Sequence, residues 1–199
     1  MRALVLETST ARGGVALFRG EELLFSESFT ADRSHSSGLF AVIERALAGQ
    51  GAPERIFVGL GPGSYAGVRI GIAAAIGISV ATGAELVGIP SIAALEEGEY
   101  LALGDARRGG YSFAHVREGE MVRGPMILTR EQMEQSVAGA GVPVYSSEEL
   151  GIAGVELRFP QVDRIGRLGV AGRGIFARGA LEPIYLREPH ITGKVIADL

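Results

Sequence analysis

The order of strand-like and helix-like segments in the first half of the chain restricts its fold more than any other feature. Three short apolar runs joined by tight turns predict an antiparallel meander over residues 3–7, 13–18 and 22–29. Apolar residues at helical spacing then alternate with short apolar runs, which predicts a helix over 34–48, a strand over 55–60, a helix over 65–81, a strand over 85–89 and a short helical stretch from Ser91. Parallel strands joined by crossover helices indicate an α/β fold.

The second half begins the same order again. It predicts strands over 100–103, 110–116, 121–128 and 142–145, with a helix from a Thr129 cap to about Val137. A partial helix near 164–174 and a tail over 182–187 complete it. We therefore expect two lobes, an N-terminal lobe over residues 1–97 and a smaller C-terminal lobe with a tail over residues 98–199.

Composition excludes several classes of protein. The chain has no cysteine, which excludes disulfides and cysteine-based zinc sites and agrees with a cytoplasmic location. Its net charge of −4 argues against a stand-alone nucleic-acid binder. The uncharged segment 70–84 is shorter than the roughly 20 residues that span a bilayer, so it predicts a buried helix and no membrane partner.

Several stretches resemble one family. Residues 61–71 read Gly-Pro-Gly-Ser-Tyr-Ala-Gly-Val-Arg-Ile-Gly, and shorter matching stretches occur at 4–10, 35–36, 88–95, 105–110 and 183–187. With the repeated β-β-β-α-β-α order, they resemble the TsaB (YeaZ) family, whose fold is the actin-like, Hsp70-ATPase or ribonuclease H-like α/β fold with two lobes, here with the second reduced. Glu7 departs from the pattern, because the family usually has Asp there.

The resemblance implies a function and a set of partners. It implies an inactive homologue within the TsaD-like glycoprotease (peptidase M22) family. Such a chain would be a scaffold required for threonylcarbamoyladenosine at the adenine beside the anticodon, in tRNAs reading codons that begin with A. The implied partners are a TsaD-like catalytic subunit, a TsaE-like ATPase and, when the chain is alone, a second copy; tRNA would be contacted only indirectly.

The same resemblance bears on metal binding. The related catalytic subunit carries a His-x-x-x-His metal pair after the fifth strand, where residues four apart share a helix face. Ser91 and Leu95 occupy the matching positions here, and neither is a competent ligand. The three histidines, His35, His115 and His190, share no such spacing, so we expect no metal.

Two loops are candidates for phosphate binding. The turn over residues 7–13 lacks the early glycine that a phosphate-cradling hairpin needs, although its hydroxyls offer hydrogen bonds. The Gly61-Pro62-Gly63-Ser64 turn lacks the Lys of a Walker loop, and Gly67 comes one residue late for a dinucleotide fingerprint. We favour a tight turn with Ser64 as helix cap and expect no cofactor of the chain's own, which leaves room for a weak or shared ATP or ADP contact at a subunit junction.

Enzyme alternatives stay open at this level. A small actin-like ATPase or kinase fits the fold, and a peptidase or metallopeptidase fits the family label. A hydrolase triad would use Ser64 with His35 and an acid. Separately, Glu7 and Asp105 could pair as carboxylates, because each ends the first strand of its lobe. The alternative interpretation of both acids is that they are solvated strand ends lining a cleft.

The packing pattern of the helix over 65–81 is the feature that favours binding to a partner. Gly67, Gly71 and Ala75 recur every four residues in the helix over 65–81, beside an apolar stripe that includes Val68, Ile72 and Ile76. Either the helix over 34–48 covers this surface through Leu39, Ile43 and Leu47, or both helices pack against another subunit. We favour the second, so the predicted partner or dimer interface is Leu39, Ile43, Leu47, Gly67, Val68, Gly71, Ile72, Ala75 and Ile76. On this hypothesis Gly71→Leu abolishes pairing and leaves the chain folded. A homodimeric scaffold unrelated to tRNA is the remaining alternative.

Overall fold

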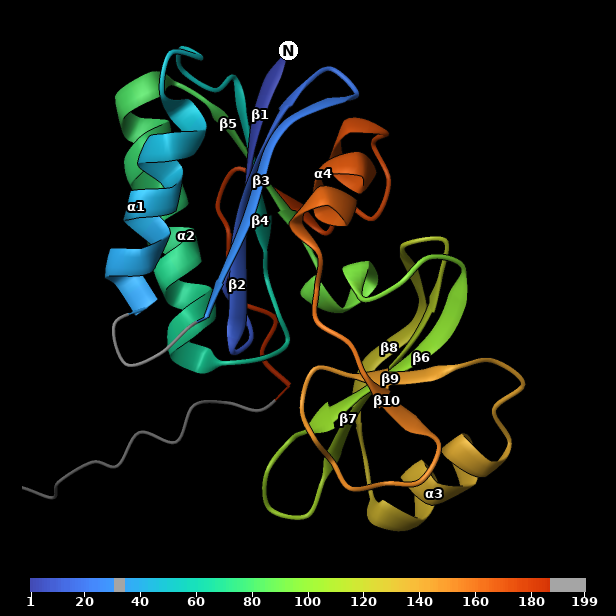
Figure 1. Ribbon diagram of the computed structural model, residues 1–199. Helices are drawn as coiled ribbons and strands as arrows, with labels where there is room; N and C mark the ends of the chain where they lie inside the picture. The colour runs from blue at the N-terminus through green and yellow to red at the C-terminus, as the bar shows by residue number, and fades with distance from the viewer. Residues whose placement is uncertain (31–34, 187–199) are drawn as a thin grey trace, which may run out of the picture.

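The computed structural model describes residues 1–30 and 35–186, which form two lobes, each built around one sheet (Figure 1). The larger sheet has six strands in the order β11-β5-β4-β1-β2-β3. Its strands are β1 (Arg2–Glu7), β2 (Arg12–Arg19), β3 (Glu22–Thr30), β4 (Arg55–Gly59), β5 (Glu85–Ile89) and β11 (Ala177–Arg178). The predicted meander is confirmed, because β1, β2 and β3 pair antiparallel, while β1, β4 and β5 pair in parallel.

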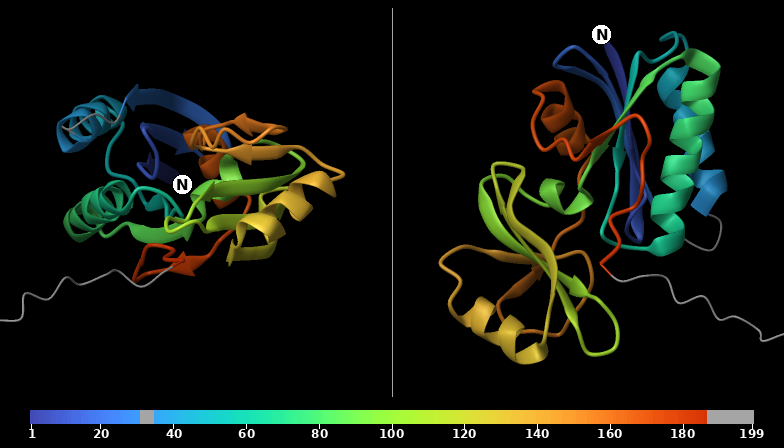
Figure 2. Two further views of the ribbon diagram at one scale, coloured as in Figure 1. Left: turned by 90° about the horizontal axis from the view of Figure 1, so that it is seen from below. Right: turned by 180° about the vertical axis from the view of Figure 1, so that it is seen from behind.

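Helices cover both faces of this sheet. Helices α1 (His35–Leu47) and α2 (Tyr65–Thr82) lie on one face, and α4 (Val162–Val170) lies on the other (Figures 1 and 2). Because strand side chains alternate between faces, Leu4 and Leu6 pack in the core under α1 and α2, while Ala3 and Val5 pack under α4. Burial on both faces explains the unbroken apolar run of β1.

The smaller lobe repeats the arrangement in reduced form. Its five-stranded sheet has the order β10-β9-β6-β7-β8. Its elements are β6 (Glu99–Asp105), β7 (Tyr111–Arg117), β8 (Glu120–Leu128), α3 (Arg130–Ala138), β9 (Val144–Ser146) and β10 (Val155–Leu157). Helix α3 starts at a capping box between Thr129 and Gln132, as the Thr129 cap predicts, and it buries Met133 against the sheet.

A short 3-10 helix (η1, Ser91–Ala94) joins the lobes. The buried Tyr100 of β6 donates its hydroxyl hydrogen to the Ile92 carbonyl oxygen at 2.8 Å and accepts from the Leu95 amide at 3.3 Å. These bonds use both functions of the hydroxyl, so they fix the junction to the first strand of the smaller lobe.

The last described elements return to the larger lobe. Helix α4 packs against β1 and β2, and β11 pairs antiparallel with β5. Close approach of α4 needs glycine at two positions. A Cβ on Gly166 would collide with the Phe18 ring, and a Cβ on Gly169 would collide with the Phe57 ring. The structure therefore differs from a C-terminal lobe over 98–199, since α4 packs on the first sheet and β11 adds a strand to it. The boundary near residue 97 itself stays a prediction. Sequence spacing missed β10 and β11 because they are only three and two residues long.

The predicted tail becomes a strap over residues 181–186, which we call the C-terminal strap; residue 187 lies outside the described part of the chain. Leu181 is buried in the core under α2, and the Ile184 amide donates to the Leu60 carbonyl at 2.9 Å. These contacts bring the strap to the start of α2.

Helix α2 is long and apolar enough, by length and composition, to cross a membrane. It packs instead on β1, β4 and β5, and its buried residues are Gly67, Val68, Gly71, Ile72, Ala74 and Ala75. The burial that the sequence predicts for this helix therefore holds for one side of α2.

Candidate functional site

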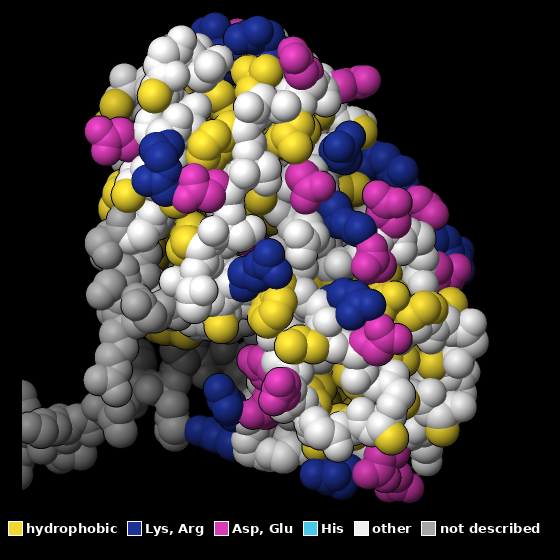
Figure 3. Space-filling model, viewed as in Figure 1, with side chains coloured by type: hydrophobic (Ala, Val, Ile, Leu, Met, Phe, Trp, Pro, Cys, Tyr) yellow, Lys and Arg dark blue, Asp and Glu magenta, His cyan; other side chains and the backbone are white. Residues whose placement is uncertain are grey.

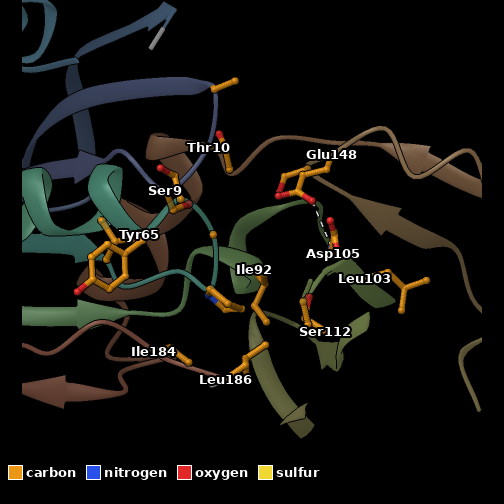
Figure 4. A pocket seen from close by; sticks show the side chains of 18 of the residues that line it. Ser9, Thr10, Tyr65, Ile92, Leu103, Asp105, Ser112, Glu148, Ile184 and Leu186 are labelled. Atoms are coloured by element: carbon orange, nitrogen blue, oxygen red, sulfur yellow. Dashed lines mark hydrogen bonds between the residues drawn. The ribbon is translucent and has the colours of Figure 1, made fainter. Parts of the chain in front are cut away.

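A cleft of about 840 Å³ lies between the two lobes. The β1–β2 turn, the segment before α2, the end of β6, the loop after β9 and the C-terminal strap line it. Figure 3 shows the surface hollowed between the lobes, with acidic and basic side chains at the edge. In Figure 4, Ser9 and Thr10 come from one lobe, and Asp105 and Glu148 come from the other.

The Gly61–Ser64 turn is held against the first hairpin. The Ser64 amide donates to the Ser9 carbonyl at 2.7 Å, and a Cβ on Gly63 would collide with that carbonyl. The Ser64 hydroxyl accepts from the Gly67 amide at 3.2 Å and so caps α2. The interpretation as a tight turn with a capped helix is confirmed.

Two glycines of α2 serve the same contact. The Thr8 hydroxyl donates to the Gly67 carbonyl at 2.8 Å. A Cβ on Gly67 would collide with the Thr8 carbonyl, and one on Gly71 would collide with the Thr8 hydroxyl. The small residues therefore let α2 approach the end of β1.

Glu7 lies beneath this wall of the cleft and is completely buried. One carboxylate oxygen accepts from the Ser9 amide at 2.5 Å, while Oε2 and the Ser9 hydroxyl have no hydrogen-bond partner among the described residues. Burial raises the pKa of Glu7, although the hydrogen bond from the Ser9 amide opposes the shift. The interpretation of Glu7 as a solvated strand end is wrong, because Gly59 of β4 and Ser91 of η1 cover its carboxylate and the side chain is fully buried.

The wall from the smaller lobe is acidic. Arg107 donates to both oxygens of Asp105, through its amide at 2.7 Å and its guanidinium at 2.8 Å. The Asp105 amide donates to Glu148 Oε2 at 3.2 Å (Figure 4). Asp105 lines the cleft, as predicted, but Glu7 does not, so the two acids do not form a pair there. Hydroxyls facing carboxylates suit a small polar ligand; the shared nucleotide contact stays a prediction.

The described candidates for metal binding lie in the junction between the lobes and in the smaller lobe. Ser91 is fully buried and accepts from the Gly61 amide at 3.0 Å, and Leu95 is core. His115 contacts Glu99 at 2.7 Å, in the smaller lobe. The His35 side chain and His190 lie outside the described residues. Within residues 1–30 and 35–186, no cluster of three or more His, Cys, Asp or Glu side chains is placed to hold an ion.

The predicted interface residues are mostly part of the chain's own core. Leu39, Ile43, Val68, Ile72 and Ala75 are at most 6% exposed, Gly67 and Gly71 are buried against Thr8, and Leu47 is half-buried. Only Ile76 of this set is exposed, at 43%. The small-residue stripe as an outer surface is therefore wrong; the interpretation that α1 and the sheet cover it fits the packing.

On the opposite side of α2, sequence reasoning assigned only Ile76 to the interface. Five exposed residues of this side recur at alternating steps of three and four, which is the spacing of a helix–helix contact. We call them the α2 seam: Ala66, Arg69, Ala73, Ile76 and Val80. Arg69 is the signal that could have found them, because it is the one charged residue of α2 and charges stay in water.

Comparison with known proteins gives related sequences. The family model of TsaD, tRNA N6-adenosine threonylcarbamoyltransferase, matches residues 29–116. The tRNA threonylcarbamoyladenosine biosynthesis protein TsaB of Haemophilus influenzae is 26% identical over 227 residues, covering 96% of this chain and 95% of that protein. The TsaB protein of Escherichia coli is 27% identical over 157 residues, covering 68% of this chain and 67% of its own length.

Solved structures agree on the fold. A Pseudomonas aeruginosa protein described as similar to the peptidase YEAZ superposes with a TM-score of 0.73 at 22% identity, covering 94% of this chain and 99% of that one. YeaZ from the same organism gives a TM-score of 0.67 at 22% identity, covering 86% and 90%. The predicted two-lobed α/β fold with a reduced second lobe is confirmed, and it is the fold of these YeaZ structures.

Proposed function

Because the chain belongs to the TsaB (YeaZ) family, we propose that it acts in threonylcarbamoyladenosine modification of tRNA as a non-catalytic scaffold. It binds a TsaD-like catalytic subunit in the cytoplasm, and a TsaE-like ATPase joins that complex. The modified base is the adenine beside the anticodon in tRNAs reading codons that begin with A, and tRNA reaches this chain only through the catalytic subunit.

The α2 seam is the observation that supports the docking role. Ile76 is 43% exposed and Val80 is 83% exposed, while the small side chains of Ala66 and Ala73 keep the N-terminal part of the seam low. Small and apolar residues at heptad spacing let a second helix pack closely, and exposed apolar side chains gain free energy when a partner removes them from water. Phe40 of α1, on the same face of the sheet, is also 53% exposed.

The cleft supports a role without chemistry of its own. Ser91 and Leu95 stand where the catalytic relative would place metal ligands, and both are buried in the junction. Glu7, at the end of β1, is sealed off from any substrate in the cleft. An ATPase or a peptidase would need reactive groups that reach the cleft.

The proposal is tested with Ile76→Asp and a matched control, Val122→Asp, which changes a 50% exposed residue of β8 in the other lobe. We expect Ile76→Asp to stay folded and to lose binding to the catalytic subunit by at least about 100-fold, because a partner would bury an unpaired charge. Val122→Asp should bind normally.

Cells depleted of the chain provide the second readout. We expect mass spectrometry of tRNA nucleosides to show loss of threonylcarbamoyladenosine, restored by wild type and Val122→Asp but not by Ile76→Asp. Unchanged threonylcarbamoyladenosine after depletion would refute the function; normal binding by Ile76→Asp would refute the surface.

We propose that the apolar end of this seam, at Ile76 and Val80, pairs two copies when the chain is alone. A C2 contact uses one patch twice, so Ile76→Asp should convert a dimer to a monomer in light scattering, while Val122→Asp stays dimeric. A dimer that survives Ile76→Asp would place the contact between copies elsewhere.

A further inference from the structure

Arg69 is the single charged residue of α2, and it lies within an otherwise apolar seam. An arginine is expensive at the centre of a helix–helix contact unless a carboxylate meets it. The position of Arg69 between Ala66 and Ala73 therefore indicates which kind of side chain a partner must present to it.

Two tyrosines hold the guanidinium in place. Its carbon lies 4.0 Å from the ring centroid of Tyr65 and 5.7 Å from that of Tyr185. Its Nε donates to the Tyr185 hydroxyl at 2.8 Å, and the two rings are 5.6 Å apart. Tyr65 is 47% exposed and Tyr185 is 40% exposed, so this clamp forms at the surface.

The clamp leaves the outer end of Arg69 available. A guanidinium has five N–H donors, and among residues 1–30 and 35–186 the hydrogen bond of the Arg69 guanidinium is the one from Nε to Tyr185. None of the ion pairs among the described residues includes Arg69. The two terminal nitrogens form a fork that matches a carboxylate, and stacking reduces the rotamer freedom that binding would otherwise remove.

We propose that Arg69 binds an Asp or Glu side chain on the helix of the partner that packs on the α2 seam; this rests on the proposed function. Ile76 and Val80 lie seven and eleven residues beyond Arg69, about 10 and 16 Å along the helix. The partner helix thus carries a carboxylate two to three turns from the apolar residues that cover Ile76 and Val80. The ion pair sets the register and direction of the two helices, and it rejects partners with a cation at that place.

The seam favours a protein carboxylate over an RNA phosphate. A phosphate contact surface needs clustered cations, and Arg69 is alone on α2 among small and apolar residues. The C-terminal strap brings Tyr185 to the site but brings no cation with it within residues 181–186.

The test measures the affinity of the full-length chain for the catalytic subunit at low and high salt. Arg69→Gln should weaken binding by about 10- to 100-fold, as expected for loss of a charge-assisted hydrogen bond, and should flatten the salt dependence. Arg69→Glu should be weaker still, and an Asp or Glu→Arg change in the facing helix should restore it. Tyr185→Phe removes only the acceptor for Nε and should cost a few-fold.

Arg130→Glu is the matched control, because Arg130 is an exposed helical arginine beside a tyrosine ring, 5.7 Å from that of Tyr111, in the other lobe. It should bind as wild type does. If wild type binds but Arg69→Glu binds within about twofold of it, the inference is overturned and the scaffold function stands. If wild type does not bind, the scaffold function itself fails.

Two other ligands of Arg69, the chain's own tail and tRNA, would give different results in these tests. If Glu188→Gln lowers the melting temperature as much as Arg69→Gln does, and neither changes the affinity, the chain's own tail pairs with Arg69 and the proposal is refuted. Arg69→Glu changing binding of tRNA to the isolated chain, with normal subunit affinity, would also refute it.

Discussion

Glu7 puts an ionisable carboxyl group where water cannot reach it. Burial raises its pKa above the ordinary value of 4.5. The folded state therefore holds the proton more tightly than the unfolded state does. The stabilisation that follows is complete below the ordinary value and is lost as the pH rises through the folded pKa.

Glu7→Gln keeps the shape of the side chain and removes its ionisation. Wild type should lose unfolding free energy as the pH rises above 4.5, and Glu7→Gln should lose less, so the variant becomes relatively more stable toward pH 8. Denaturant unfolding between pH 5 and pH 9 measures this, with the exposed Glu131→Gln of α3 as control. Parallel profiles for Glu7→Gln and wild type would contradict it.

The sequence shows an acid at the end of a strand, but not that the acid is buried. Glu7 is covered by chain near Gly59 and Ser91, more than fifty residues away. Local patterns carry no information about such contacts, so the solvated interpretation failed here and held for Asp105, which lines the cleft.

At the scale of elements, α2 has one side for its own lobe and one side that faces outward. Its extent was predictable, because the turn chemistry at Ser64 and the apolar run are local signals. The assignment of its sides was not, because almost every position is apolar and both stripes have helical spacing. The earlier expectation for Gly71→Leu is corrected accordingly: a side chain there collides with Thr8, so the variant should unfold and not merely lose its partner.

A pair of alanine substitutions separates the two sides of α2. Gly71→Ala should lower the unfolding free energy by about 1–3 kcal/mol, since the new Cβ meets the buried Thr8. Gly77→Ala meets nothing within 4 Å and should raise it by up to about 1 kcal/mol through helix propensity. Thermal and denaturant unfolding check both; equal effects would mean that the two sides are not distinct.

At the scale of the whole molecule, Glu96 ties the two lobes together. It pairs with Arg164 of α4 and lies 3.5 Å from Arg158, which follows β10. Burial opposes its ionisation, but the Glu97 amide and these two arginines outweigh that effect and lower the pKa of Glu96. Its stabilisation is therefore present above the ordinary pKa and lost as the pH falls through the folded one.

Glu96→Gln should destabilise the protein by about 1–2 kcal/mol at neutral pH, because it leaves Arg164, whose Nη1 is buried and unpaired among the described residues, without its carboxylate. Glu134→Gln, which breaks an exposed pair within α3, should change little. Hydrogen exchange at the junction should rise only in Glu96→Gln. The prediction fails if both variants unfold alike.

The two-lobed plan was predictable because strand and helix order is written locally, whereas the path of the last segment was not. Gly166 and Gly169 give no sign of the rings of Phe18 and Phe57 that require them. The smaller lobe is consequently inserted between β5 and α4 of the larger one.

That insertion has a consequence for synthesis on the ribosome. Translation delivers β1 to β5 first and α4 only after the entire smaller lobe. Until then, the sheet face formed by Ala3, Val5 and Phe57 has no cover of its own. The nascent chain must therefore expose an apolar sheet face while about seventy further residues are made. During that interval chaperones can bind this face and protect it from aggregation.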